Sequence, residues 1–184
     1  MNEAAVKQGT TWAIDPAHSQ IQFKVRHMMI STVTGTFDKF RSEVEMTGED
    51  LSTAKVFFEA DTASIHTGSA DRDNHLRSAD FFDVENHPKL TFKATSIENA
   101  GDNEWKVKGD LTIRGVTRPI TLDMEWNGVN KDPWGNMKAG LVVRGKINRK
   151  DYGLNWNAML ETGGVLVSDE VRVECEVQYA RQDK

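Results

Sequence analysis

Three residues near the N-terminus are of the types that form a hydrolytic triad. Asp15, His18 and Ser19 lie within one short segment. In a triad, histidine takes the proton of a serine nucleophile and the carboxylate orients the histidine, so spatial arrangement defines it and adjacency in sequence does not. The chain has no Gly-x-Ser-x-Gly nucleophile elbow. We therefore assign no catalytic residues, and we expect a protein that is not an enzyme.

A second group combines histidines with carboxylates around a predicted helical segment. The histidines are separated by nine and twelve residues, whereas zinc ligands on a helix are typically one turn apart. We therefore predict no metal site and no cofactor, and we interpret these residues as solvated loop and capping groups. The alternative is an enzyme acting on an apolar substrate, in which these histidines or His27 serve as acids, bases or metal ligands. The group consists of His66, His75 and His87 with Asp71, Asp73 and Asp83.

His27 and Cys175 are the remaining candidates. His27 is in phase with Ile21, Phe23 and Val25, so its side chain should point inward from the end of a strand. It is either a core histidine satisfied by a neighbour or a polar contact for a ligand headgroup. Cys175 is the single cysteine, which excludes an internal disulfide and a cysteine-cluster metal site; it should be an inert packed thiol.

Bulk properties exclude several classes of protein. The 184 residues suit one domain, taken as 1–184 with an N-terminal tail at 1–11. A net charge of −5 without a basic block argues against a nucleic-acid partner. The longest apolar runs are about three residues, far below the roughly 20 that a transmembrane helix needs. The N-terminus lacks the pattern of a signal peptide, so we expect a cytoplasmic protein, or a periplasmic one if a leader has been removed.

Alternation of apolar and polar residues with period two dominates the chain and predicts about eight long strands. Short turns connect them, which indicates antiparallel pairing. The exception is a short helical insert around residues 69–83. The apolar phases include Ile21, Phe23 and Val25; Val56 and Phe58; Leu90, Phe92 and Ala94; Trp105, Val107, Leu111 and Ile113; Ile120, Leu122, Met124 and Trp126; Leu141, Val143 and Ile147; Val171, Val173, Cys175 and Val177.

Strands with one apolar face bury it by stacking as a sandwich or by closing into a barrel, and long strands in a meander favour the barrel. The polar face must point outward, opposite to an outer-membrane barrel, which predicts a soluble protein. An eight-stranded barrel can be filled or can hold a small ligand. Small residues in the inward phase could leave space, or could simply fit a tapered core. They are Ala54, Ala60, Ala94, Gly109, Ala139 and Gly145.

Several segments, taken together and in order, resemble the YceI family of lipocalin-like, polyisoprenoid-binding proteins. The resemblance extends over residues 12–179, and its most recognisable part is the hairpin at Gly109–Pro119. The other segments are Asp15–Ser19 running into the strand that ends at His27, Gly35–Phe37, Arg72–Leu76, Ser78–Asp83, His87–Phe92, Ile147–Leu154 and Ser168–Glu176.

This resemblance implies an all-β fold, a single eight-stranded antiparallel lipocalin-like barrel whose apolar pore takes a long isoprenoid or another lipid. It is also compatible with a homodimer. We predict carriage, storage or sequestration of such a ligand, with Leu76, Phe81 and Phe82 as a flap over the mouth, or as anchors of the insert on the outer wall. The predicted pore-lining residues are Phe23, Val25, His27, Phe37, Val56, Phe58, Phe92, Leu111, Val143 and Ile147.

Overall fold

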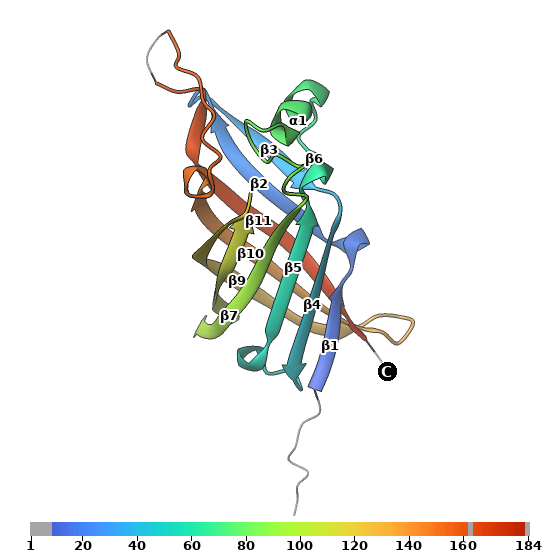
Figure 1. Ribbon diagram of the computed structural model, residues 1–184. Coiled ribbons are helices and arrows are strands. Elements are labelled where there is room, and N and C mark those ends of the chain that lie inside the picture. Colours follow the sequence, from blue (N-terminus) through green and yellow to red (C-terminus); the bar gives the residue numbers. More distant parts are fainter. Residues whose placement is uncertain (1–8, 162–163, 183–184) are drawn as a thin grey trace, which may run out of the picture.

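The computed structural model describes residues 9–161 and 164–182, in which strands predominate and α1 (Ala70–Arg77) is the single α-helix (Figure 1). Residues 1–8 of the predicted tail lie outside the described residues, whereas 9–11 belong to the first strand. The strands are β1 (Gly9–Ile14), β2 (Gln20–His27), β3 (Ser31–Phe37), β4 (Phe40–Thr47), β5 (Lys55–Asp61), β6 (Ile65–His66), β7 (Lys89–Gly101), β8 (Glu104–Ile113), β9 (Val116–Lys131), β10 (Met137–Asn148) and β11 (Val167–Gln182).

Eight of these segments form a closed antiparallel barrel. The hydrogen-bonded order is β1-β4-β5-β7-β8-β9-β10-β11, and pairing of β1 with β11 closes the ring. The closing contact is short, from Thr11 opposite Gln182 to Ile14 opposite Tyr179. Because every neighbouring pair is antiparallel and short turns connect most of them, the predicted meander and barrel are confirmed.

Three long strands are interrupted, and this produces the additional segments β2, β3 and β6. Pro16 lacks the N–H that a strand ladder requires, and it starts a 3₁₀ turn between β1 and β2. The Asp15 carboxylate accepts a hydrogen bond from the Ala17 N–H at 3.0 Å and stabilises this turn. Similar breaks separate β3 from β4 and β5 from β6.

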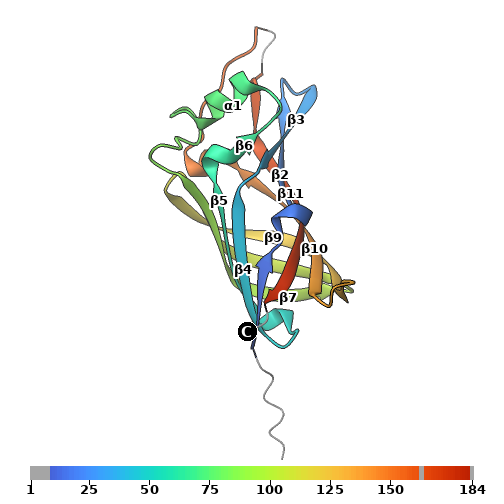
Figure 2. The ribbon, with the colours of Figure 1, turned by 90° about the vertical axis from the view of Figure 1, so that its right-hand side faces the viewer.

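Beyond these breaks the barrel has a different construction. The N-terminal half of β11 pairs with β2, which pairs with β3, and β3 pairs with the short β6. Among the described residues β6 has no second strand neighbour, and the segment that contains α1 lies across this end of the barrel (Figures 1 and 2). Ser69 caps the helix by accepting a hydrogen bond from the Arg72 N–H. We call this end the mouth end and the opposite one the closed end.

Burial alternates along the strands as the sequence predicts. In β8, Val107, Leu111 and Ile113 are buried and the residues between them are mainly exposed. The outward positions carry mostly charged and polar side chains. None of the helices among residues 9–161 and 164–182 has the length and apolarity required to cross a bilayer.

Candidate binding cavity

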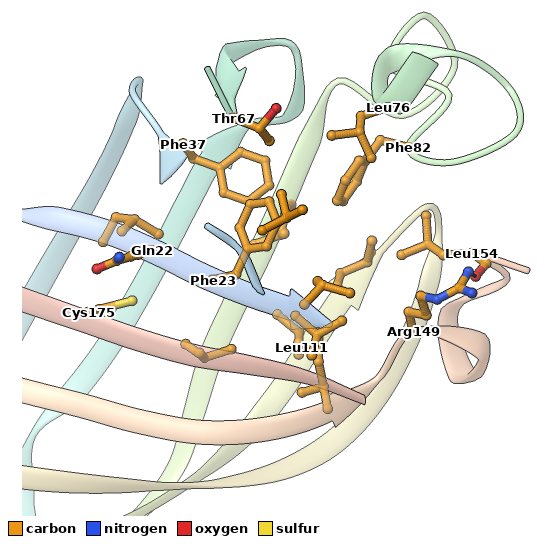
Figure 3. A pocket seen from close by; sticks show the side chains of 18 of the residues that line it. Gln22, Phe23, Phe37, Thr67, Leu76, Phe82, Leu111, Arg149, Leu154 and Cys175 are labelled. Atoms are coloured by element: carbon orange, nitrogen blue, oxygen red, sulfur yellow. Dashed lines mark hydrogen bonds between the residues drawn. The ribbon is translucent and has the colours of Figure 1, made fainter. Parts of the chain in front are cut away.

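The mouth half of the barrel encloses a cavity of about 580 Å³. This volume lies within the roughly 300–1,000 Å³ that is usual for small-molecule sites. Inward residues of β2, β3, β5 and β7–β11 form its walls, and the segment around α1 forms its cover (Figure 3). The apolar wall includes Ile21, Phe23, Val25, Val33, Phe37, Phe58, Leu90, Phe92, Leu111, Ile113, Ile120, Leu122, Leu141, Val143, Ile147, Val171 and Val173.

The small inward residues leave no gap at their own positions, and of the two interpretations made from sequence the first therefore does not hold in its simple form. The missing side chain of Gly109 is replaced by the Phe92 ring, whose ζ carbon would lie 2.5 Å from an added Cβ. Leu122 fills the position beside Gly145 in the same way. None of the small residues named above lines the main cavity. At Gly109 and Gly145 the missing side chain lets a large neighbouring side chain lie flat against the wall.

The closed half is packed with large side chains. Trp12, Met46 and Met124 are buried there, and the space that remains is about 80 Å³. Val56 lines this second space and not the main cavity. Strand β5 starts at the closed end, and Val56 precedes Phe58 by two residues on the same face, so Val56 lies nearer to the closed end. Tyr179 lines both spaces and marks the boundary between them.

The remaining predicted lining residues, from Phe23 to Ile147, all line the main cavity, and so do Leu76, Phe81 and Phe82. The Phe82 ring lies edge-on to Phe37, with ring centroids 5.7 Å apart. This placement favours a cover over the mouth rather than anchors on the outer wall. Among the described residues, no hydrogen-bond partner is found for the imidazole of His27, which lies half-buried at the cavity.

Polar groups on the cavity are concentrated at the mouth. Arg26 and His27 come from the end of β2, while Asp71, Arg72 and His75 come from α1. The His75 ring connects the helix to the loop before β11, because it lies 4.6 Å from the ring of Trp156 and 5.1 Å from that of Phe81. A ligand in this cavity would therefore contact mainly carbon along its length and charged groups at the mouth.

Arg149 holds the loop that forms the other side of the mouth. Its side chain is buried, and its guanidinium donates to four backbone carbonyls. Burial lowers the pKa of Arg149, and the Asp169 carboxylate opposes this shift. Because a planar guanidinium with several fixed donors can satisfy several acceptors at once, Arg149 fixes both ends of the loop. The acceptors are the carbonyl oxygens of Leu154 (2.6 Å), Trp156 (2.8 Å), Ser168 (2.9 Å) and Val167 (3.3 Å).

Two polar groups lie deep in the barrel. The Tyr179 hydroxyl forms a hydrogen bond of 2.8 Å with the Ser42 hydroxyl, which donates to the carbonyl of Phe57. Burial raises the pKa of Tyr179 to about 12, and it raises the pKa of the Cys175 thiol to about 11. At neutral pH Cys175 is therefore a protonated, poorly nucleophilic thiol.

The structure does not bring the other candidates together. The three histidines near α1 each face a different carboxylate: His66 with Asp73, His75 with Asp80, and His87 with Asp83. Within residues 9–161 and 164–182, no cluster of three or more His, Cys, Asp or Glu side chains could hold a metal ion.

The triad-type residues are also separated. His18 Nδ1 lies 2.8 Å from the Asp15 carboxylate, but the Ser19 hydroxyl is hydrogen-bonded to the backbone of Gln178. Ser19 therefore serves the junction between β2 and β11.

The predicted set left out many residues of the site, among them Tyr179, Arg149 and Trp156. Tyr179 could have been found by extending the alternation of Val173, Cys175 and Val177 by one further step. Arg149 and Trp156 lie in a turn and a loop, where no periodicity indicates which side chains face inward.

Known proteins share this sequence pattern and fold. The family described as YceI-like domain matches residues 12–179. A UPF0312 protein of Staphylococcus aureus (strain N315) is 42% identical over 172 residues, which are 93% of this chain and 98% of that protein. A Campylobacter jejuni YCEI protein has a similar structure, with a TM-score of 0.74 and 31% identity, over 86% of this chain and 90% of that chain.

Two more distant structures share the fold alone. Burkholderia cenocepacia BcnA has a TM-score of 0.76 at 23% identity, over 90% of this chain and 98% of that chain. A Saccharophagus degradans structure, described as a polyisoprenoid binding domain, has a TM-score of 0.66 at 16% identity. It covers 91% of this chain and 97% of that chain.

Proposed function

The chain belongs to the YceI-like family, and from this premise we propose that it binds a long-chain isoprenoid lipid in its barrel for carriage, storage or sequestration. The observation that carries the proposal is the cavity of about 580 Å³, whose walls are mainly apolar and whose charged side chains lie at the mouth. The S. degradans relative described as a polyisoprenoid binding domain has the same fold, which supports the choice of ligand class.

The chemistry of the walls favours a chain of carbon atoms. Each CH₂ group removed from water contributes about 0.8 kcal/mol, so a long chain gains affinity without directional contacts. Burying a polar group beside Val25, Val143 or Leu111 without a partner would instead cost about 1–3 kcal/mol. We therefore propose that the chain of the lipid lies along the barrel and that its headgroup stays near His27 and Arg72 at the mouth.

The test is to identify what the protein carries. Protein purified from its native host is extracted with organic solvent, and the extract is analysed by mass spectrometry. We expect an isoprenoid lipid in a stoichiometric amount. An extract without any apolar molecule would contradict the proposal.

A variant with a blocked cavity makes the test specific. Val143→Trp places an indole in the cavity, whereas Arg144→Trp places the same group on the outer face of the same strand. We expect Val143→Trp to lose most of the bound lipid and Arg144→Trp to retain it. Circular dichroism should show that both variants are folded. Equal lipid content in the two variants would place the ligand outside the barrel.

A further inference from the structure

Large apolar side chains that face solvent gather at the mouth end. The described residues include six such side chains, and five of them lie on two neighbouring segments at this end. We call these five the apolar rim. They are Met28 (39% exposed), Met29 (58%) and Ile30 (77%) in the turn between β2 and β3, and Met159 (85%) and Val165 (37%) in the loop before β11.

The two segments of the rim are held side by side. The Met28 N–H donates to the Leu166 carbonyl at 2.7 Å, and Val167 is opposite His27 in the adjoining ladder. Both segments project beyond the barrel at the end that carries α1 (Figures 1 and 2). The sixth exposed apolar side chain, Trp134 (83%), is in the turn between β9 and β10, at the closed end near the C-terminus.

The turn of the rim is built from residues that local preferences disfavour. Met28 and Met29 have φ values of 53° and 61°, in the left-handed region where a side chain is strained. Hairpin turns with two such residues normally use Asn and Gly, which adopt this conformation readily and are polar or small. Keeping methionine here lowers local stability and exposes apolar surface, so folding does not explain the choice.

The rim continues directly into the cavity. Arg26 and His27, which precede the turn, line the cavity, and so do Leu166 and Val167, which follow Val165. An apolar ligand that leaves through this mouth would be exposed to water unless the mouth faces an apolar phase. In this step the inference rests on the proposed function; the strain and the exposure of the rim are independent of it.

We propose that the apolar rim inserts into the surface of a lipid bilayer, so that the cavity opens toward the hydrocarbon region. Two narrow projecting segments offer little flat area for a protein partner, for which a stable contact needs about 800 Å² on each side. A fluid lipid surface adapts to such a shape. The flexible, unbranched side chain of methionine in turn adapts to the lipid surface.

Charge predicts how this contact depends on the lipid. The chain has a net charge of −5, and Glu161 follows Met159 of the rim by two residues. At the mouth, Arg26 and Arg72 line the cavity together with Asp71. An anionic surface therefore gains little by attraction, and apolar insertion dominates. Binding should take place on electrically neutral phosphatidylcholine vesicles, and it should persist when salt is raised.

The experiment measures co-sedimentation of the full chain with phosphatidylcholine vesicles. The main variant combines Met28→Asn, Met29→Gly and Ile30→Ser, which removes the apolar turn and relieves its strain. We expect at least a tenfold loss of vesicle binding together with an unchanged or higher melting temperature. Met159→Ser, in the second segment, should reduce binding several-fold. The matched control Trp134→Ser, an equally exposed apolar residue at the other end, should change binding less than twofold.

Several results would overturn this inference: no vesicle binding by the unmodified protein, full binding by the turn variant, or loss of binding in Trp134→Ser. A dimer of the unmodified protein that the turn variant converts to a monomer would assign the rim to a second copy. Lipid content by mass spectrometry separates the two proposals. Lipid without vesicle binding refutes the inference alone, and vesicle binding by a protein that yields no lipid refutes the proposed function alone.

Discussion

The two ends of this barrel are made from the same alternating strands, yet one is packed and the other is hollow. At the closed end, Trp12, Met46 and Met124 meet across the interior and leave about 80 Å³. At the mouth end, smaller aliphatic side chains and rings that lie against the wall leave about 580 Å³. Alternation determines which residues face inward, and the size and direction of each side chain determine whether they fill the space.

Strand continuity differs between the ends in the same sense. At the closed end, β1 is paired on both sides, with β4 and with β11. At the mouth end three strands have broken, β6 has one strand neighbour among the described residues, and α1 with its flanking segment covers the opening. The packed end therefore provides the stability that allows the other end to remain open and to carry a strained, exposed turn.

The largest effect should come from the packed end. Trp12 is 1% exposed, and Trp12→Ala removes an indole from the core of the closed end. Replacing a buried aromatic residue by alanine typically costs about 3–5 kcal/mol. We expect a loss of this size in the free energy of unfolding, measured by urea denaturation, with an unchanged lipid content per folded molecule. If the folded variant lost its lipid, the two ends would not be independent.

Most of the fold follows from the sequence because strand phase is a local property. The run from Ile21 to Val25 and the run from Val171 to Val177 fix the inward faces without reference to any other part of the chain. Consequently, every residue predicted to line the pore faces the interior. Of these predicted residues, Val56 is the one that lines the smaller space instead of the main cavity.

The hollow half could not be derived in this way. Gly109 and Gly145 look like gaps in the sequence, but Phe92 and Leu122, from neighbouring strands, fill them. Such a contact depends on the register between strands and on rotamers, neither of which periodicity encodes. The guanidinium of Arg149 is hidden for the same reason, because its four carbonyl partners belong to a loop without a repeating pattern.

A pair of glycines sharpens the boundary between packed and hollow. In Gly109→Ala the new methyl group would lie 2.5 Å from the Phe92 ring and 2.6 Å from the Lys93 carbonyl oxygen. Overpacking of this kind costs about 1–3 kcal/mol. We expect the free energy of unfolding to fall by this amount, and we expect lipid content to fall as Phe92 is displaced toward the cavity.

Gly140→Ala is the control for this pair, because its nearest neighbour, the Asn127 Cβ, would lie at an ordinary 3.8 Å. It should leave stability within about 1 kcal/mol of the unmodified protein, since replacing glycine without strain restricts the unfolded chain. If Gly109→Ala were equally harmless, the Phe92 ring would not be fixed by its packing against Gly109, and this contact would not define the boundary between the packed and the hollow half.

The smallest effect concerns Tyr179, which borders both spaces, and it is compared with Tyr152, a buried tyrosine outside them. Tyr179→Phe removes the hydroxyl bonded to Ser42 and should cost about 1 kcal/mol near neutral pH. Within the described part of the chain, the Tyr152 hydroxyl has no hydrogen-bond partner, so Tyr152→Phe should be neutral or stabilising. Equilibrium unfolding in urea measures both differences.

Alkaline pH provides the second measurement of the same pair. Burial raises the pKa of both tyrosines to about 12, above their ordinary value of 10.0, because the folded state favours the neutral phenol. A raised pKa contributes stability that is complete below the unfolded pKa and is lost as pH rises through the folded pKa, so stability should fall between about pH 10 and pH 12. Each Tyr→Phe change should make this fall shallower, while the Cys175 thiol, with a pKa of about 11, retains part of it. If stability fell as steeply in both variants as in the unmodified protein, ionisation of these two phenols would not explain the loss of stability at alkaline pH.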